Sequence, residues 1–145
     1  MAITRINSLG ITDGTIVNGD INASAAITST KLTGVNDAKV WVNFNGTGTV
    51  AIRGSFNVSS VTDNGTGDYT VNFTNNLTDA NYVVATSMNS NSFSATGDHR
   101  FVLYVKGTGT AYDMNTNNVG LENSRVELNG QQRDDSSMIS IAIFR

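Results

Sequence analysis

The sequence predicts an all-β protein: an antiparallel β-sandwich of jelly-roll type, preceded by an extended N-terminal arm. Val, Ile and Thr together supply 42 of the 145 residues, and these β-branched side chains favour pleated strands. Strong helix formers are scarce, with six Leu, three Lys, two Glu and two Gln. From Lys39 onward, short apolar–polar alternations separated by turns recur about every ten residues, which is typical of a sandwich.

Residues 1–37 are predicted to form the arm, because their apolar residues are isolated and spaced about five apart. This spacing fits neither a coiled coil nor a long alternating strand. These few apolar side chains bury too little surface to offset the entropy of ordering the segment. The arm therefore needs another surface to pack against, most simply other copies of the chain. The residues expected at this assembly interface are Ile3, Ile6, Ile11, Ile16, Ile21, Ile27 and Leu32.

Residues 38–145 are predicted to form the sandwich. Asn-Gly turn dipeptides at 45–46, 64–65 and 129–130 punctuate the alternating runs. The predicted strands are 39–44, 49–54, 55–61, 67–74, 81–88, 100–107, 124–130 and 138–144. The side chains expected in the core are Val42, Phe44, Val71, Phe73, Leu103, Val105, Ile139, Ile141 and Ile143.

Charge and composition exclude several classes of partner. The formal net charge is −3, and no run of Lys or Arg provides the electrostatic surface of a nucleic-acid or membrane-surface binder. There is no cysteine for disulfides or thiolate metal sites. The sequence contains no apolar run of 18 residues, which would predict membrane insertion. Its N-terminal residues also lack the apolar stretch of a signal peptide. We therefore expect synthesis in the cytoplasm.

No constellation in the sequence predicts an enzyme. His99 is the only histidine and no Gly-x-Ser-x-Gly motif accompanies it. Asp134 and Asp135 are adjacent, so on an extended backbone they point apart, and a charged loop tip is expected. The Gly-Thr-Gly at 46–48 matches part of a dinucleotide-binding fingerprint, but an alternating strand and not a helix follows it. We expect no catalytic residue, no cofactor and no metal.

The segment Asp63–Asp68 resembles a calcium-binding loop, because it combines oxygen ligands with glycines. It lacks the acidic residue that closes such a loop at its far end. An Asx-stabilised turn is therefore expected.

Two stretches resemble proteins of tailed bacteriophages. KVWVNFNGTGTVAIRGSFNVSSVTDNGTGDYTVNFTNNLTDANYVV (39–84) resembles a module of tail fibres and other virion proteins. ITDGTIVNGDINASAAITSTKL (11–32) is similar to the Ile-x-Asp-Gly-Thr-Ile repeats that precede such modules. The resemblance implies a virion protein that forms a homotrimer, contacts other virion proteins of the tail, baseplate or capsid, and binds a host surface component, often a glycan. It carries no catalytic or ligand residues.

Two placements in the virion stay open, because fibre chains usually have several hundred residues and this sequence has 145. The chain is expected to be a small tail fibre or fibre tip that binds the host. The alternative is a capsid decoration protein, a cement or head-fibre protein that stabilises the phage head.

A host-binding surface is expected in the loops of 88–99 and 107–137, whose amides and hydroxyls offer donors and acceptors for a glycan. Two alternatives stay open for four aromatic side chains: ordinary sheet packing, which is favoured, or an outward face where rings can stack on sugars; the four are Trp41, Tyr82, Tyr104 and Tyr112. The candidate receptor-binding residues are Asn89, Asn91, His99, Arg100, Tyr112, Arg125 and Arg133.

Overall fold

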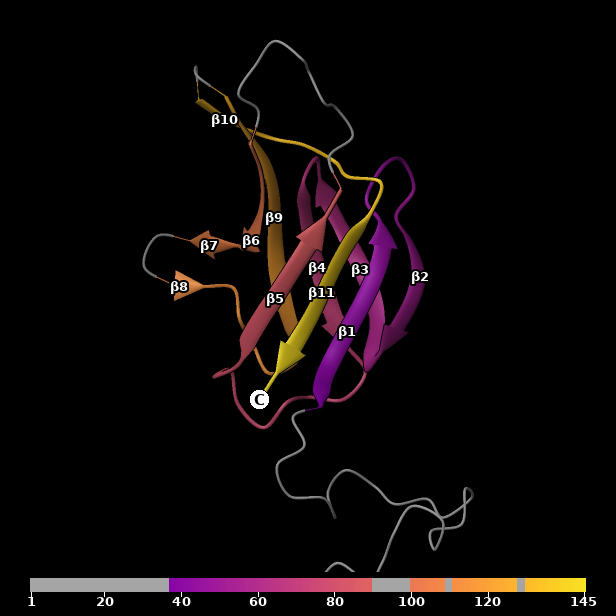
Figure 1. Cartoon of the computed structure of the whole chain (residues 1–145). Helices are drawn as coiled ribbons and strands as arrows, with labels where there is room; N and C mark the ends of the chain where they lie inside the picture. Colours follow the sequence, from indigo (N-terminus) through magenta and orange to yellow (C-terminus); the bar gives the residue numbers. More distant parts are fainter. Residues whose placement is uncertain (1–36, 90–99, 109–110, 128–129) are drawn as a thin grey trace, which may run out of the picture. The chain divides into compact units, whose positions relative to one another are not determined.

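The computed structural model confirms the predicted antiparallel β-sandwich (Figure 1). It describes residues 37–89, 100–108, 111–127 and 130–145. The strands in chain order are β1 (Ala38–Asn45), β2 (Ala51–Phe56), β3 (Val58–Gly65), β4 (Asp68–Phe73), β5 (Val83–Met88), β6 (Arg100–Val105), β7 (Gly107–Thr108), β8 (Ala111–Tyr112), β9 (Asn118–Glu127), β10 (Gly130–Arg133) and β11 (Ile139–Phe144).

Two antiparallel sheets form the layers of the sandwich. The first sheet has the order β2-β1-β11-β5, and the second combines β3, β4, β9, β10 and β6. Strand β9 organises the second sheet, because it pairs with β4 over residues 118–122 and with β10 over residues 124–127, while β6 pairs with residues 121–126. The short strands β7 and β8 pair with each other as a separate ribbon.

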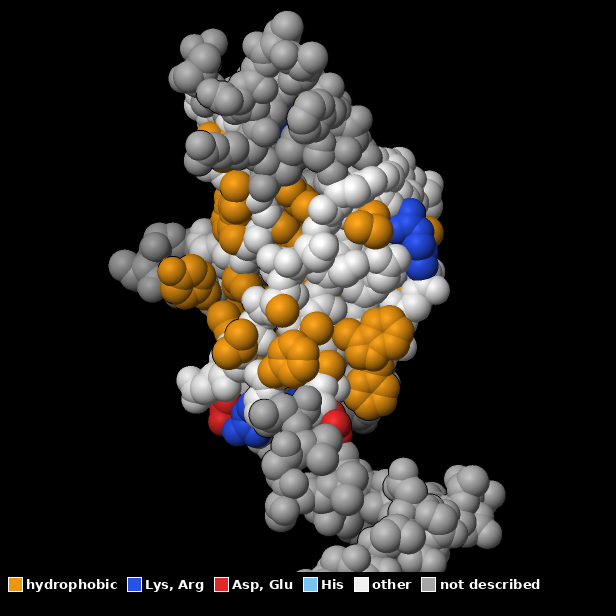
Figure 2. Space-filling view, in the orientation of Figure 1, with side chains coloured by type: hydrophobic (Ala, Val, Ile, Leu, Met, Phe, Trp, Pro, Cys, Tyr) orange, Lys and Arg blue, Asp and Glu red, His pale blue; other side chains and the backbone are white. Residues whose placement is uncertain are grey.

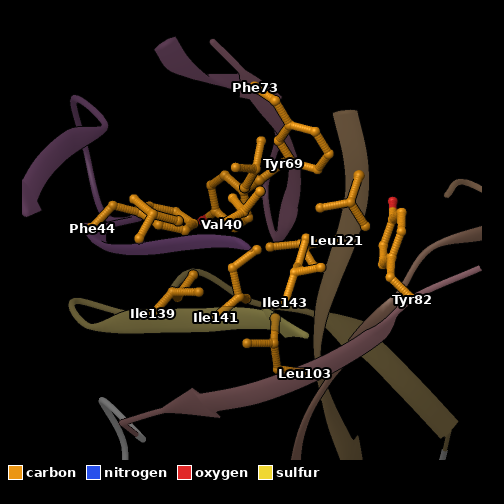
Figure 3. Packing of buried hydrophobic residues seen from close by; sticks show 13 residues of the cluster. Val40, Phe44, Tyr69, Phe73, Tyr82, Leu103, Leu121, Ile139, Ile141 and Ile143 are labelled. Atoms are coloured by element: carbon orange, nitrogen blue, oxygen red, sulfur yellow. The ribbon is translucent and has the colours of Figure 1, made fainter. Parts of the chain in front are cut away.

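The core lies between the sheets and follows the period-two alternation of the strands. In Figure 3, side chains of β1 and β11 meet those of β4 and β9. The rings of Phe44 and Tyr69 pack edge to face across this layer, with centroids 5.3 Å apart. All nine predicted core residues lie in this cluster, with Val105 only partly buried. The buried apolar set is Val40, Val42, Phe44, Tyr69, Val71, Phe73, Tyr82, Leu103, Val119, Leu121, Ile139, Ile141 and Ile143.

Tyr82 follows the favoured one of the two alternatives, because its ring takes part in sheet packing. Its side chain is buried, packs edge to face against Phe73, and contributes to the core. Its hydroxyl lies 3.2 Å from the carbonyl oxygen of Asn115 and 3.3 Å from that of Asn118. Burial raises the pKa of Tyr82 to about 12. A ring with a polar tip therefore serves as core here, with its hydroxyl directed at backbone carbonyls.

The predicted strand 55–61 is wrong, because the chain changes sheets within it. Strand β2 ends at Phe56 in the first sheet and β3 begins at Val58 in the second. Asn57 between them has a φ of 56°, in the left-handed region where Asn is tolerated. Its side-chain oxygen accepts the backbone N–H of Asn75, which ties the crossing to the end of β4.

The predicted arm lies outside the described residues except for Asp37. This applies to all of its assembly residues, from Ile3 to Leu32. Within the described part of the chain, no helix is long and apolar enough to cross a membrane.

Candidate functional site

Among the described residues, a group of charged side chains lies on the second sheet, where β4, β9 and β10 meet. Lys106 Nζ is 2.9 Å and 2.7 Å from the two carboxylate oxygens of Asp68. Arg133 bridges the two acids, with Nη1 at 3.1 Å from Asp68 Oδ2 and Nη2 at 2.6 Å from Glu122 Oε2. The hydroxyl of Tyr104 hydrogen-bonds to the other carboxylate oxygen of Glu122. We call Asp68, Lys106, Glu122 and Arg133 the ion cluster.

The strand register brings the ion cluster together. Asp68 and Glu122 are directly opposite each other in the β4–β9 pair, where two like charges repel. Strand β10 pairs with β9 just beyond β4, so its last residue, Arg133, lies beside the first residue of β4. Lys106 directly follows β6, on the other side of β9. Two cations therefore compensate two carboxylates that the sheet forces together.

The hydrogen bond between Arg133 and Glu122 shifts the pKa values of both side chains. The hydrogen bond from Arg133 is the main cause that lowers the pKa of Glu122 below its ordinary value. The pKa of Arg133 is raised, chiefly by the same hydrogen bond. Burial, followed by the hydrogen bond to Glu122, raises the pKa of Tyr104. These groups hold the charge states that their pairing needs at neutral pH, which is the behaviour of a structural network.

Two of the candidate receptor-binding arginines have partners within the protein. Arg133 belongs to the ion cluster. Arg125 donates from Nη2 to Gln132 Oε1 at 3.2 Å and lies 3.7 Å from Asp134 Oδ2. Both side chains hold the β9–β10 hairpin, so their contacts serve the fold.

Asn89 likewise joins two parts of the first sheet's end. Its Nδ2 donates to Ser137 Oγ at 2.8 Å, and its Oδ1 accepts the backbone N–H of Met138 at 2.8 Å. Its carbonyl oxygen accepts the hydroxyl of Ser136. The amide that was expected to face a glycan therefore binds the segment that leads into β11.

Of the other candidates, Tyr112 is 72% exposed in the small β7–β8 ribbon. Arg100 begins β6, and only its backbone is described. Asn91 and His99 lie outside the described residues. The described residues thus do not bring the predicted receptor set together into one site.

The expectation of surface loops over residues 107–137 is wrong. It contains β7 to β10, and Val119 and Leu121 of β9 are fully buried. Asn123 and Ser124 in the same strand are buried as well. Much of this polar stretch is therefore the centre of the second sheet.

Asp134 and Asp135 do not form a charged loop tip, because both are half-buried. Asp135 Oδ1 accepts the backbone N–H of Gly67 at 2.8 Å and lies 2.7 Å from the hydroxyl of Tyr69. That hydroxyl is also 2.9 Å from the carbonyl oxygen of Gly46. Burial, with Asp135 beside it, raises the pKa of Tyr69. The adjacent acids thus fasten the segment before β11 to the core.

The calcium-like segment forms the expected Asx turn. Asp63 Oδ1 accepts the backbone N–H of Gly65 at 2.9 Å, and Asn64 Nδ2 donates to Thr70 Oγ1 at 2.9 Å. In the ranges that the structure describes, no three His, Cys, Asp or Glu side chains are grouped so that they could hold a metal ion.

The outer face of the first sheet carries a second candidate surface, which is apolar. Figure 2 shows hydrophobic side chains gathered over the half of this sheet near the C-terminus. Trp41 and Tyr112 are exposed, which fits the less favoured, outward-facing alternative, whereas Tyr104 is half-buried. A signal for this surface exists in the sequence: the run 138–144 is apolar at Ala142 and Phe144 as well as at its three core isoleucines. Apolar residues on both faces of a strand indicate two covered faces.

Comparison of the chain with protein-family models, with curated proteins and with solved structures gave no match.

Proposed function

We propose that this chain is a bacteriophage virion structural protein: a small, trimeric tail fibre or fibre-tip protein that binds a host surface component. The observation that carries the proposal is the resemblance of residues 39–84 to a virion protein module. This stretch supplies β1 to β4 and the beginning of β5, so it contributes strands to both sheets. It corresponds to a structural part of the sandwich and not to a peripheral insertion.

The structure supports a binding or scaffolding role through its surfaces. The charged and amide side chains described above are engaged in internal networks, while aromatic rings remain accessible at Tyr112 and Trp41. Rings with accessible faces can stack on sugars. Tyr112 is therefore the described candidate that best retains a role in contacting a host glycan.

A capsid decoration role is the second candidate, and one observation favours it. Arg125, Arg133 and Asn89 have internal partners, which reduces the polar surface offered to a glycan. The exposed apolar face of the first sheet is instead suited to contact with protein. A decoration protein needs such contacts and no receptor chemistry.

Gold-labelled antibody raised against the whole protein tests the proposal on purified virions. Label confined to the tail end supports the fibre, and label distributed over the head supports decoration. Virions without label, and without peptides of this protein in their mass spectrum, would show that the proposed function is wrong. For the fibre, Tyr112→Ala should reduce adsorption to host cells, whereas Thr62→Ala on an exposed strand should not.

A further inference from the structure

An apolar strip crosses the outer face of the first sheet, and the strand register defines it. One cross-strand row runs through Trp41, which lies opposite Phe56 on β2 and Ala142 on β11; Ala142 in turn lies opposite Ala85 on β5. The next row contains Ala38, Phe144 and Val83. We call these seven residues the apolar strip: Ala38, Trp41, Phe56, Val83, Ala85, Ala142 and Phe144.

The strip leaves a large apolar area in water. Phe56 is 57% exposed, Val83 68%, Trp41 41% and Phe144 38%. Because an aromatic side chain presents about 150–250 Å², the three rings alone expose roughly 250–300 Å². With Val83 and the alanines, the strip reaches the few hundred Å² of the largest apolar patches on soluble monomers, which are often functional.

The opposite face of the sandwich lacks this character. On the second sheet, Asn72 Nδ2 donates to the hydroxyls of Ser60 and Thr62, at 3.0 Å and 2.9 Å. The ion cluster covers the neighbouring strands. Among the described residues, the outer face of the second sheet is therefore mostly polar and hydrogen-bonded to itself, with Val102 of β6 as an exposed apolar residue, whereas the apolar strip of the first sheet gains from being covered.

The charges around the strip decide what can cover it. None of its seven residues is charged. At the end of the sheet, Arg145 is paired with Asp79, so this neighbouring charge is neutralised within the chain. Two identical strips can therefore meet without burying a charged side chain of the strip, and the nearest further cation on β1 is Lys39, which is half-buried beside Ala38. The exposed area of the strip is only a part of the roughly 800 Å² per partner that a stable interface buries, so residues beside the strip must take part in the contact as well.

We propose that the apolar strip is a contact surface between copies of this chain, with a second copy as its occupant. The inference goes beyond the proposed function, because it applies wherever the protein resides. It places an interface on the sandwich itself, in addition to any contact made by residues 1–36. Trp41 becomes buried when the copies meet.

Trp41 is the only tryptophan of the chain, so its fluorescence reports on the strip directly. The experiment measures acrylamide quenching of the full chain, with the mass of the particle determined by sedimentation on the same samples. Val83→Asp is the main variant, because it introduces a charge on β5, two strands and about 10 Å from Trp41, and does not touch the ring. Thr62→Asp is the matched control, because it introduces the same charge on an exposed strand of the other sheet. The new carboxylate can still accept the hydrogen bond that Asn72 Nδ2 donates to Thr62.

The expected result is an assembled wild type in which Trp41 is quenched several-fold more slowly than in Val83→Asp at equal concentration. Dilution should expose the ring as the copies separate. Thr62→Asp should behave like the wild type, and all three proteins should show the same circular dichroism spectrum. Equal quenching in the wild type and Val83→Asp would overturn the proposal, whether the wild type is assembled or not. So would a monomeric wild type with a shielded Trp41, since residues of the same chain would then cover the strip. These outcomes do not depend on where the protein lies in a virion.

Discussion

Gly67 shows how strongly single residues constrain this fold. Its φ is 65°, in the left-handed region, and an added Cβ would lie 2.3 Å from the carbonyl oxygen of Asn123. The backbone of Gly67 approaches β9 so closely because its carbonyl accepts the N–H of Asn123 at 2.8 Å. The sequence predicted a turn here from its Asp and Gly residues, but this approach depends on a residue 56 positions away in the chain, which turn chemistry cannot indicate.

Gly67→Ala is therefore expected to destabilise the protein much more than Gly48→Ala. Gly48 has nearly the same φ, 63°, but no atom within 4 Å of an added Cβ. Its substitution should cost only the left-handed strain, about 1–2 kcal/mol. Gly67→Ala adds a steric overlap with the backbone of Asn123, which must then shift. Its free energy of unfolding should fall by at least about 4 kcal/mol. Urea unfolding of both variants measures the difference, and similar losses would contradict the close approach seen here.

Among the elements, β9 was found only at its end, because the predicted strand 124–130 overlaps it at residues 124–127 alone. Predicted strands such as 39–44 and 138–144 were found because every second residue is apolar and buried. In β9, only Val119 and Leu121 continue that pattern, and the next inward residue is Asn123. Asn123 is buried because its Nδ2 donates to the carbonyl of Asp134 and the hydroxyl of Ser136, at 2.7 Å and 2.9 Å. A buried polar residue is stable only with such partners, and they are distant in sequence.

Contacts between residues distant in sequence also explain which parts of the candidate site could be predicted. The outward position of Trp41 follows from strand alternation, because Val40 and Val42 on either side of it point into the core. The internal roles of Arg125 and Arg133 were not predicted, because they follow from the pairing of β10 with β9. The strand β10, with the sequence GQQR, has no apolar residue that would have indicated it.

The junction of β4, β9 and β10 should make stability depend on acid pH. In the folded protein, the hydrogen bond from Arg133 lowers the pKa of Glu122 below its ordinary value of 4.5. A group with a lowered folded-state pKa stabilises above its unfolded pKa, and this stabilisation is lost as pH falls through the folded value. The free energy of unfolding should therefore fall as pH is lowered from about 5, and it should fall less in Glu122→Gln, which has no proton to bind.

Chemical denaturation at several pH values measures this dependence. At pH 7, Glu122→Gln should be less stable than wild type by about 1 kcal/mol, the scale of a partly exposed ion pair. Arg133→Met serves as the second variant, because Arg133 is the main cause of the lowered pKa. Its acid-dependent loss should also be smaller. A Glu122→Gln protein with the full wild-type loss between pH 5 and 3 would place the acid sensitivity elsewhere.

At the scale of the whole molecule, the two sheets share one core and should unfold together. Leu121 on β9 is fully buried in the cluster that also contains Ile141 and Val42 of the first sheet. Leu121→Ala removes packing between the layers and should cost about 2–5 kcal/mol, as large core truncations do.

Trp41 lies on the other sheet and reports on it alone, whereas circular dichroism reports on both. At one low protein concentration, the urea midpoints from both probes should shift by the same amount. The control is Val102→Ala on neighbouring β6, where the side chain is 39% exposed. It should change the free energy of unfolding by no more than about 0.5 kcal/mol with either probe. A Leu121→Ala protein whose circular dichroism midpoint falls while the Trp41 midpoint stays would show that the sheets unfold independently.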